Sequence, residues 1–488
     1  MHAFWVWHAQ VAHGPTQQQT GQQSEKKETL SFHGVKVSFS GITYLEFPIC
    51  TMRSYLSWSI IVSLAGLLFG IDVIVISGAD KTLQALWNSS DFFHGFVVMG
   101  MALWGTVIGA MLGGIPTNKW GRKKTLIAIG LLFFVSAVGS ALVSDPYTFA
   151  VFRFIGGLAV GASTIAAPAY ISEIAPAAVR GRIVATYQLS IVAGILVAFL
   201  SNYLLSDIGA NAWRWMLGVE AFPAVLYSVL VFLVPESPRW LALKGRRSEA
   251  ESVLRQIDPD VDVSSALALD GEPERGGIGQ LFNRKYQTPV LLVFFIAFFN
   301  QFSGINAVLY YSPRIFEEAG LESQAAFLGS VGIGLANLLF TLAGMALIDR
   351  LGRKQLMYIG SVGYIVSLTF VALSFLLGWK GLAIPVFLFL FIASHAIGQG
   401  AVIWVFLAEI FPTHLRASGQ AFGSSVHWVL AALIPSFIPA LFTQVGAGFV
   451  FVMFALMMVG QLLWVFFAMP ETKGQTLEEV SDKLTNEL

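Results

Sequence analysis

Three ionisable side chains, Asp72, Arg153 and Glu220, lie inside long apolar stretches of this sequence. Charged groups within a membrane-spanning segment are costly and usually functional. Counted from the predicted segment ends, each lies six or seven helical residues below the same surface, a depth of about 9–10 Å, so we expect the three to meet. One arginine and two carboxyls are neutral together only when one carboxyl carries a proton, so the trio can hold or release a proton. The alternative is a static buried ion pair.

Amide side chains form a second polar group. Asn300, Gln301 and Asn306 spread over nearly two turns of one predicted helix, which favours a lined cavity over the alternative, a hydrogen bond between helices. His395 and His427 also lie in apolar stretches, and we interpret them as hydrogen-bonded bundle residues in preference to proton relays.

The composition indicates that these residues lie in a membrane. Hydrophobic residues make up 56% of the 488 positions and charged residues 12%, against about 45–50% and about 25% in soluble domains. This balance excludes a disordered chain. With 29 Lys and Arg against 29 Asp and Glu, no basic excess remains to bind nucleic acid. The single cysteine, Cys50, excludes an internal disulfide framework and a cysteine-built metal site.

Twelve apolar runs are long enough to cross the hydrocarbon core, which needs about 20 residues of helix. They cover residues 55–78, 92–115, 123–143, 147–170, 183–205, 213–234, 288–311, 325–348, 354–378, 383–408, 419–442 and 446–468. Long continuous runs favour helices over the short alternating segments of a β-barrel. The predicted fold class is therefore an all-α membrane protein with twelve transmembrane helices.

The distribution of basic residues predicts the orientation. If the first run begins in the cytoplasm, the loops and tail on that side hold 21 Lys and Arg from Arg53 onward, whereas the outer loops hold four. Because cytoplasmic loops carry the excess of basic residues, both termini are predicted to be cytoplasmic.

An internal repeat divides the chain into two halves. Three motifs recur at offsets of 231–236 residues, namely GRK at 121–123 and 352–354, EI-x-P at 173–176 and 409–412, and PE-[S/T] at 235–237 and 470–472. The predicted domains are an N-terminal six-helix bundle at 52–234, a cytoplasmic linker with short helices at 235–287, a C-terminal six-helix bundle at 288–468 and a cytoplasmic tail at 469–488. Two halves with a site between them at mid-membrane are typical of secondary transporters that work by alternating access.

Residues 1–51 do not fit this scheme. They are rich in Gln and His, contain no apolar run and lack the features of a signal peptide. We interpret them as a disordered extension or as the product of a misplaced start codon, with Met52 as the true beginning.

The repeated motifs place charged residues at the cytoplasmic ends of helices. Arg and Lys there can pair with carboxylates and with helix C-terminal carbonyls, and so lock the halves together on that side. The alternative for each basic residue is simple anchoring by the positive-inside rule. The predicted cytoplasmic gate consists of Arg122, Glu173, Arg180, Arg182, Asp349, Arg353, Glu409 and Arg416.

Together with the GRK motifs, the segments PESPRW at 235–240, QFSGIN at 301–306 and PETKG at 470–474 resemble the sugar porter family of the major facilitator superfamily. The resemblance implies the major facilitator fold and a monosaccharide carrier, and proton-coupled members carry an Asp and an Arg where this chain has Asp72 and Arg153. It also implies sugar contacts at Gln188, Asn300, Gln301, Asn306, Asn337, Trp404 and His427. These residue types suit a sugar, because an amide donates and accepts without charge and an indole adds an apolar face.

Several positions depart from the family pattern. Asn300 replaces a glutamine and is one methylene shorter, His427 stands where relatives carry an amide, and Ala396 stands where the glucose transporters have a glutamate. These changes bear on which sugar is bound. Asn118 replaces the usual Asp of the first cytoplasmic motif, whereas Asp349 keeps it in the second, so a weaker lock is expected in the N-terminal half.

The predicted function is import of a hexose or pentose together with protons, by alternating access across the cell inner membrane. Asp72 is the predicted proton carrier, Arg153 sets its proton affinity and Glu220 modulates it. A facilitative uniporter of the same fold would not need Asp72 and Arg153. A non-transporting sugar sensor usually has a long cytoplasmic tail, whereas about 20 residues follow the last span here.

The remaining expectations concern chemistry and partners. The sequence has no nucleotide-binding P-loop, nucleophile–base pair or set of metal ligands, so we predict no enzymatic activity, no cofactor and no metal. The expected partners are a sugar, protons and the lipid bilayer, without nucleic acid, and the chain is expected to work as a monomer.

Overall fold

The structure is a computed structural model that describes residues 54–484 apart from 177, 268–276, 380, 477–478 and 481–482. The predicted extension at 1–51 lies outside the described residues, as do part of the linker, the end of the tail and Lys380, one of the four basic residues assigned to outer loops.

The N-terminal half runs from the first helix to residue 232. It consists of α1 (Ser54–Val75), η1 (Ile76–Gly78), α2 (Asp80–Leu86), α3 (Asp91–Phe93), η2 (His94–Met99), α4 (Met101–Leu112), α5 (Gly114–Lys119), α6 (Arg122–Leu142), α7 (Pro146–Ile174), α8 (Arg180–Leu205), α9 (Ala212–Gly218) and α10 (Ala221–Phe232). The linker contains α11 (Pro238–Leu243), α12 (Arg247–Ile257), α13 (Val263–Ala266), η3 (Ile278–Phe282) and η4 (Arg284–Tyr286).

The C-terminal half follows the linker. It consists of α14 (Gln287–Phe302), α15 (Ile305–Glu318), α16 (Ser323–Leu351), α17 (Arg353–Leu376), α18 (Ala383–Ile397), α19 (Gln399–Glu409), α20 (Arg416–Val445) and α21 (Ala447–Phe467).

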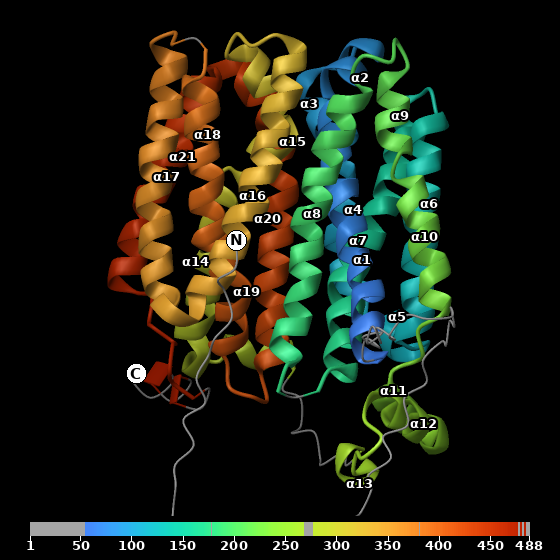
Figure 1. The fold of residues 1–488 in the computed structure, drawn as a ribbon. Coiled ribbons are helices and arrows are strands. Elements are labelled where there is room, and N and C mark those ends of the chain that lie inside the picture. The colour runs from blue at the N-terminus through green and yellow to red at the C-terminus, as the bar shows by residue number, and fades with distance from the viewer. Residues whose placement is uncertain are drawn as a thin grey trace, which may run out of the picture. The chain divides into compact units, whose positions relative to one another are not determined.

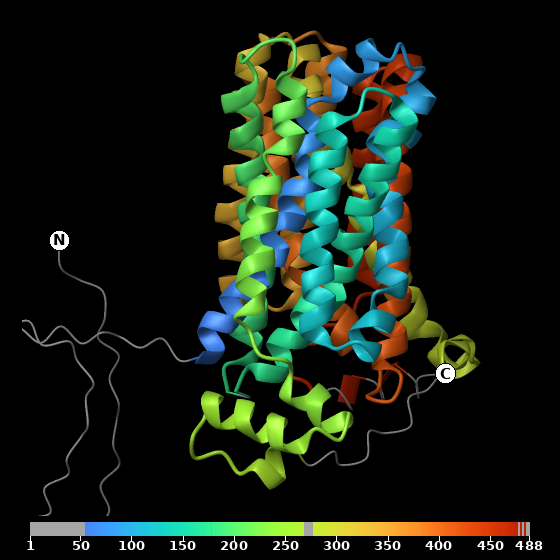
Figure 2. The same cartoon turned by 90° about the vertical axis from the view of Figure 1, so that its right-hand side faces the viewer.

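The two halves lie side by side, the N-terminal half in blue to green and the C-terminal half in yellow to red (Figure 1). The longest helices that pack across the junction are α8 against α16 and α4 against α20, and shorter contacts include η2 against α20 and η1 against α15. The linker helices α11–α13 lie at one end of the bundles, called the linker end here (Figure 2). Helix α2 lies at the opposite end, called the distal end (Figure 1).

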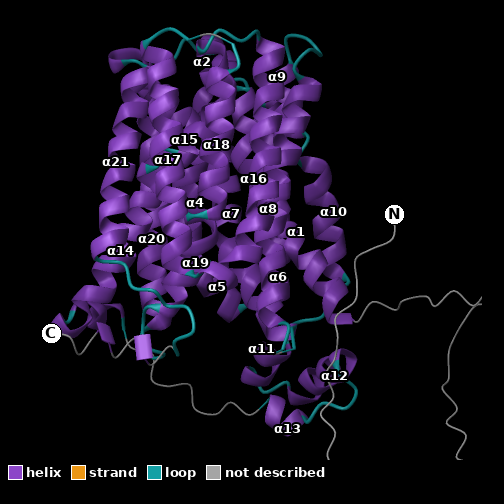
Figure 3. Cartoon of the chain, turned by 60° about the vertical axis from the view of Figure 1, so that its left-hand side comes forward, coloured by secondary structure: helices purple, strands orange, loops and turns teal. Residues whose placement is uncertain are grey.

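The predicted all-helical membrane fold is confirmed. The described residues contain no strand (Figure 3). They include 11 helices that are long and apolar enough to cross a membrane, and 12 if the pair Asp91–Met99 and Met101–Lys119, bent by 41°, counts as one span. Helices satisfy their own backbone hydrogen bonds, which is why apolar runs of this length adopt them in lipid.

The second span is bent where it packs against α20. Its π-helical segment η2 ends at Met99, directly before Gly100, and a Cβ atom at Gly95 would lie 2.1 Å from the backbone oxygen of Ser436. A Cβ atom at Gly100 would lie 2.3 Å from the Ser436 hydroxyl. Only glycine permits this close approach of the two halves.

Helices α4 and α7 pack through glycines spaced four residues apart. Gly105 and Gly109 of α4 face Gly157 and Gly161 of α7, where a Cβ atom at Gly157 would lie 1.9 Å from the backbone oxygen of Ala102. Small residues at this spacing let helices approach closely in a membrane. This contact fixes the position of α7, the helix that carries Arg153.

Two other spans are interrupted near residues that the sequence singles out. The breaks lie at Gly304 between α14 and α15 and at Gly398 between α18 and α19. Irregular backbone at membrane depth is tolerated only where it is buried in protein or lines a cavity. In transporters, broken helices mark the binding site.

Candidate functional site

Asp72, Arg153 and Glu220 come together inside the N-terminal half. Arg153 of α7 donates from Nη1 to Asp72 Oδ1 and from Nη2 to the Asp72 backbone oxygen, both at 2.7 Å. Glu220, which directly precedes α10, interacts electrostatically with both residues. Each of the three is at most 1% exposed. The trio therefore meets, as its common depth in the sequence leads us to expect.

The trio is incompletely hydrogen-bonded. Among the described residues, Asp72 Oδ2, Arg153 Nε and both carboxyl oxygens of Glu220 have no hydrogen-bond partner. An unpaired carboxylate oxygen is costly to bury, and two carboxylates beside one guanidinium repel each other. Both costs fall when one carboxyl binds a proton. The arrangement therefore suits reversible proton binding.

The C-terminal half reaches this trio through α15. Tyr310 is fully buried and interacts electrostatically with Arg153 and Asp72, and its hydroxyl has no hydrogen-bond partner within the described part of the chain. Asn306 lies one helical turn before Tyr310 on the same helix. Helix α15 thus connects the buried trio with a predicted sugar contact.

Gln301 and Asn306 are hydrogen-bonded across the break between α14 and α15. Gln301 lies at the end of α14 and Asn306 in the first turn of α15, and Asn306 Nδ2 donates to Gln301 Oε1 at 2.7 Å. In an unbroken helix, residues five apart point about 140° away from each other. The expectation of one continuous helix is therefore wrong here, because Gly304 with φ +82° turns the chain between the two amides.

His427 of α20 lies between two tryptophans. Its ring centroid is 4.9 Å from that of Trp404 and 5.0 Å from that of Trp428. Gln301 Nε2 lies 3.2 Å from His427 Nδ1 and 3.3 Å from its Nε2, so it donates to an unprotonated ring nitrogen. Trp404 is 37% exposed. Together these residues offer a ring face and hydrogen-bonding groups at one place.

The other two predicted sugar contacts lie elsewhere in the junction of the halves. Gln188 is partly buried on α8, and Asn337 on α16 is 6% exposed. These two helices pack against each other. Within the described residues, no hydrogen bond joins either side chain to the group around Gln301.

Three polar residues that the sequence did not assign extend the amide group. Asn300 Nδ2 donates to Gln399 Oε1 at 3.3 Å, Gln399 Nε2 to Gln461 Oε1 at 2.8 Å, and Gln461 Nε2 to Ser361 Oγ at 2.8 Å. Gln399 and Gln461 are fully buried. The signal that would have found Gln461 is a single glutamine in the otherwise apolar α21.

The repeated motifs form a compact hydrogen-bonded cluster in the N-terminal half. Arg122 donates to the two oxygens of Glu173 at 2.8 and 2.9 Å, and Ser237 Oγ donates to Glu173 Oε2 at 2.5 Å. Glu236 accepts the backbone N–H groups of Arg122 and Lys123 at the start of α6. A carboxylate at this place is favoured by the helix dipole.

The C-terminal half repeats the same cluster. Arg353 donates to Glu409 at 2.7 and 3.1 Å, and Thr472 Oγ1 donates to Glu409 Oε2 at 2.6 Å. Glu471 accepts the backbone N–H groups of Arg353 and Lys354 at the start of α17. The sequence repeat is therefore also a repeat of contacts.

These pairs brace each half and do not join the halves in this structure. Arg122–Glu173 and Arg353–Glu409 each lie within one half. Their bond lengths are similar, so the ion pair of the N-terminal half is not longer for having Asn118 in place of the usual Asp. The retained Asp349 is 86% exposed and 3.7 Å from Arg353, a pair that contributes little.

The remaining predicted gate residues lie at the starts of α8 and α20. Arg180 and Arg182 are exposed, and Arg416 donates to Thr413 Oγ1 at 3.2 Å. None of these described pairs joins the two halves, so the gate between the halves stays a prediction, for a conformation in which the linker end is closed.

Charged residues join the halves at the distal end instead. Asp80 of α2 pairs with His94 at 2.7 Å and with Arg314 of α15 at 3.0 Å. Lys81 donates to Glu317 at 2.5 Å. Two further hydrogen bonds between the halves join Arg314 to Gln84 and Gln324 to Asp207. The distal end is therefore held closed by contacts from both halves.

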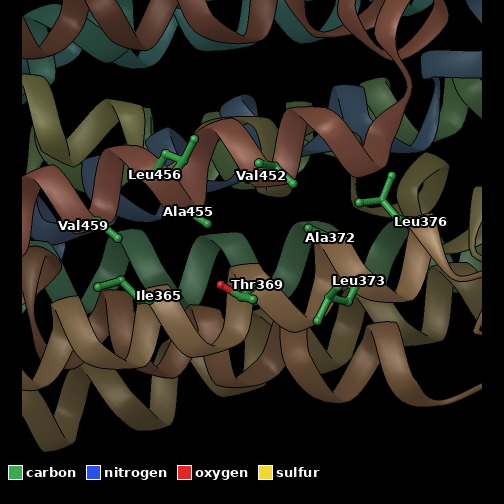
Figure 4. Close-up of a pocket in the computed structure, with 9 residues that line it drawn as sticks. All are labelled: Ile365, Thr369, Ala372, Leu373, Leu376, Val452, Ala455, Leu456 and Val459. Carbon is green, nitrogen blue, oxygen red and sulfur yellow. The ribbon is translucent and has the colours of Figure 1, made fainter.

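Two cavities are lined by residues that do not belong to the amide group. One of about 270 Å³ lies beside the distal ion pairs and is lined by Lys81, Gln84, Asp91, Arg314, Glu318, Phe442 and Thr443. The other, of about 170 Å³, lies between α17 and α21 (Figure 4). Thr369 supplies the one hydroxyl among its nine lining side chains, so it lacks the hydrogen-bonding groups that a sugar needs.

Known proteins resemble this chain over most of its length. The sequence pattern of the family described as "Sugar (and other) transporter" matches residues 58–484. The arabinose–proton symporter of Bacillus subtilis is 33% identical over 90% of this chain and 98% of its own length. The D-xylose–proton symporter of Escherichia coli is 32% identical over 87% and 94%. The inward-open structure of the xylose transporter XylE from E. coli superposes with a TM-score of 0.79 at 31% identity, over 88% of this chain and 99% of that one.

Proposed function

Because this chain belongs to the sugar transporter family, we propose that it is a proton-coupled symporter that imports a monosaccharide by alternating access across the cell inner membrane. The buried pair of Asp72 and Arg153, with Glu220 beside it, carries the proposal. A facilitative carrier needs no ionisable trio at membrane depth, where such groups are costly. The relatives named as arabinose–proton and xylose–proton symporters support a pentose or hexose as the substrate.

In this proposal Asp72 carries the proton. When Asp72 is ionised it holds Arg153, and when it is protonated that hold weakens, so α1 and α7 are free to shift. Tyr310 interacts with this pair and lies on α15 with Asn306, so proton binding and sugar binding act on the same helix. A ligand shifts such an equilibrium only by binding one state more tightly.

The sugar site in this proposal is built by the C-terminal half. Gln301, Asn306 and His427 supply hydrogen bonds, and Trp404 supplies an apolar ring face. Gln188 and Asn337 approach from the helices at the junction of the halves.

The proposed orientation has the linker end in the cytoplasm, where the basic residues lie. The distal ion pairs then close the outer entrance. Opening of that end requires the linker end to close, with Arg122, Arg353 and their neighbours pairing between the halves.

Reconstitution into liposomes tests the function. A panel of radiolabelled pentoses and hexoses is offered with and without an imposed proton gradient. We expect at least one sugar to accumulate above its outside concentration only when the gradient is present. Transport that never exceeds equal concentrations would indicate a uniporter, and binding without transport a sensor.

The variant Asp72→Asn tests whether proton coupling can be removed without loss of sugar transport. The amide keeps the shape but cannot ionise, so proton-driven accumulation should be lost while exchange between equal sugar concentrations persists. Asp260→Asn, on the exposed linker, is the matched control and should accumulate sugar like the unaltered chain. Accumulation against a gradient by Asp72→Asn would show that another residue carries the proton.

A further inference from the structure

Six side chains of the C-terminal half form one continuous line of hydrogen bonds, called the amide ladder here. In order, each donating to the next, they are Asn306, Gln301, Asn300, Gln399, Gln461 and Ser361. Ser361 Oγ then donates to the backbone oxygen of Met357 at 2.7 Å. The ladder begins at the predicted sugar site and ends inside α17, and it crosses α14, α19 and α21 on the way.

All the donors point in the same direction along the ladder. The backbone oxygen of Met357 can only accept, so the Ser361 hydroxyl that donates to it leaves its own oxygen to accept from Gln461. Gln461 must then turn its nitrogen to Ser361 and its oxygen to Gln399. The same requirement passes along each amide to Asn306. Hydrogen bonds aligned in this way polarise and strengthen one another.

Burial makes this direction costly to reverse at a single residue. Gln399, Gln461 and Ser361 are fully buried, and Asn300 and Gln301 are 3% and 1% exposed. Turning one amide by itself would set two oxygens or two nitrogens against each other without water to replace the lost bonds.

Asn306 is the partly exposed end of the ladder. Its Nδ2 donates inward to Gln301 Oε1, which leaves its Oδ1 to accept from a ligand. The deep end therefore determines which group the shallow end offers. The short Asn300 side chain joins the ladder because its Nδ2 reaches Gln399 Oε1, at the start of α19.

We propose that Gln399 and Gln461 are positioning residues that set the donor and acceptor sense of the sugar-binding amides. The proposal rests on the proposed function and narrows the substrate: the site selects a sugar with a hydroxyl that donates to Asn306 Oδ1. A fluorine at that carbon of the sugar accepts but does not donate, so the corresponding fluorodeoxy sugar is poorly bound. Gln399 and Gln461 need not touch the sugar.

The test compares a transported sugar with its singly fluorinated analogues as competitors of uptake. In the unaltered chain, one analogue should inhibit uptake about tenfold or more weakly than the parent sugar, which is the effect of one lost hydrogen bond. Gln461→Met removes the link between Gln399 and Ser361, so the amides from Gln399 to Asn306 can turn. The concentration of this analogue that inhibits uptake by half should then come within about threefold of that of the parent sugar.

Gln461→Glu is the conservative variant. Burial keeps this carboxyl protonated, so its O–H donates to Ser361 Oγ in place of the amide N–H and its other oxygen still accepts from Gln399. The analogue pattern should therefore stay as in the unaltered chain. Asn202→Leu is the control for loss of a buried amide. Asn202 is 1% exposed, lies in the N-terminal half away from the ladder, and donates to the Val75 backbone oxygen of the same half. This control variant should lower stability without changing the pattern.

The outcomes separate the two proposals. If Gln461→Met and Gln399→Met both fold, transport sugar and keep the unaltered analogue pattern, the ladder is only a link between helices and the inference is overturned. If the unaltered chain takes up no sugar from the panel, the proposed function itself fails. If Gln461→Met does not fold, Ser361→Ala removes the same anchor with a smaller change and must give the same relaxed pattern.

Discussion

At the residue scale, the ion pairs of this protein differ in burial, and this difference indicates which pair suits proton binding and which suits bracing. Asp72 and Arg153 have side chains 0% and 2% exposed and leave charged atoms unpaired, an arrangement that suits a site that changes its protonation. Arg122 and Glu173 are each 10% exposed and share two hydrogen bonds, which suits a brace. Arg246 and Glu249 are about half exposed in the linker; hydrogen bonds from Arg246 hold the pKa of Glu249 below its usual value.

This ranking predicts how single substitutions act on stability. Glu173→Gln should lower the melting temperature in detergent by several degrees, because it leaves a mostly buried arginine without its anion, at a cost of about 1–3 kcal/mol. Glu409→Gln, the repeat mate, should behave alike. Glu249→Gln removes an exposed anion and serves as the control with an unchanged melting temperature. Equal melting temperatures for all three would contradict the assigned bracing role.

At the scale of elements, the breaks in the spans matter more than the spans themselves. Gly304 and Gly398 each lie where a membrane helix is interrupted. The break at Gly304 lets Gln301 and Asn306 bond, and that at Gly398 precedes Gln399 in the ladder. The proposed binding chemistry therefore gathers where the helical backbone stops.

Gly304→Ala tests this dependence. The residue has φ +82°, and an added Cβ would lie 2.5 Å from Cδ2 of Phe454. We expect sugar affinity, measured by equilibrium binding to the purified protein, to fall by about tenfold or more, because the turn that brings Asn306 to Gln301 shifts. Gly320→Ala is the matched control: its φ is +89° but a Cβ meets nothing within 4 Å, so it carries only the backbone strain of about 1–2 kcal/mol. A similar affinity loss in both variants would remove the special role of Gly304.

At the scale of the whole molecule, closure is unequal at the two ends. At the distal end Asp80, Lys81 and Gln84 pair with Arg314 and Glu317 across the halves. At the linker end, the described pairs of the repeated motifs stay within each half. The proposed alternating access requires the distal contacts to break and a new set to form at the linker end.

Cross-linking the distal end tests that requirement. Because Cys50 is the single cysteine, Cys50→Ser gives a background for Lys81→Cys with Glu317→Cys, joined by a short reducible linker. Transport should stop while sugar binding persists, and reduction should restore transport. The two single-cysteine variants, treated alike, should keep transporting. Full transport by the cross-linked protein would show that this end need not open.

The sequence by itself determined the number of spans, the two halves and the meeting of Asp72, Arg153 and Glu220. These follow from apolar run length, from repeated motifs and from the rise of a helix per residue, all of which are local properties. The residues of the sugar site were named from a resemblance, and their assignment stays a prediction.

Only the tertiary structure decided which partners these residues have. Gln399 meets Asn300 across 99 positions and Gln461 across 62, the amides of the seventh span bond through a turn at Gly304, and the gate pairs close within each half. No local pattern specifies such contacts. A buried polar group must be satisfied by whichever helix packing brings beside it, and that packing depends on all the spans together.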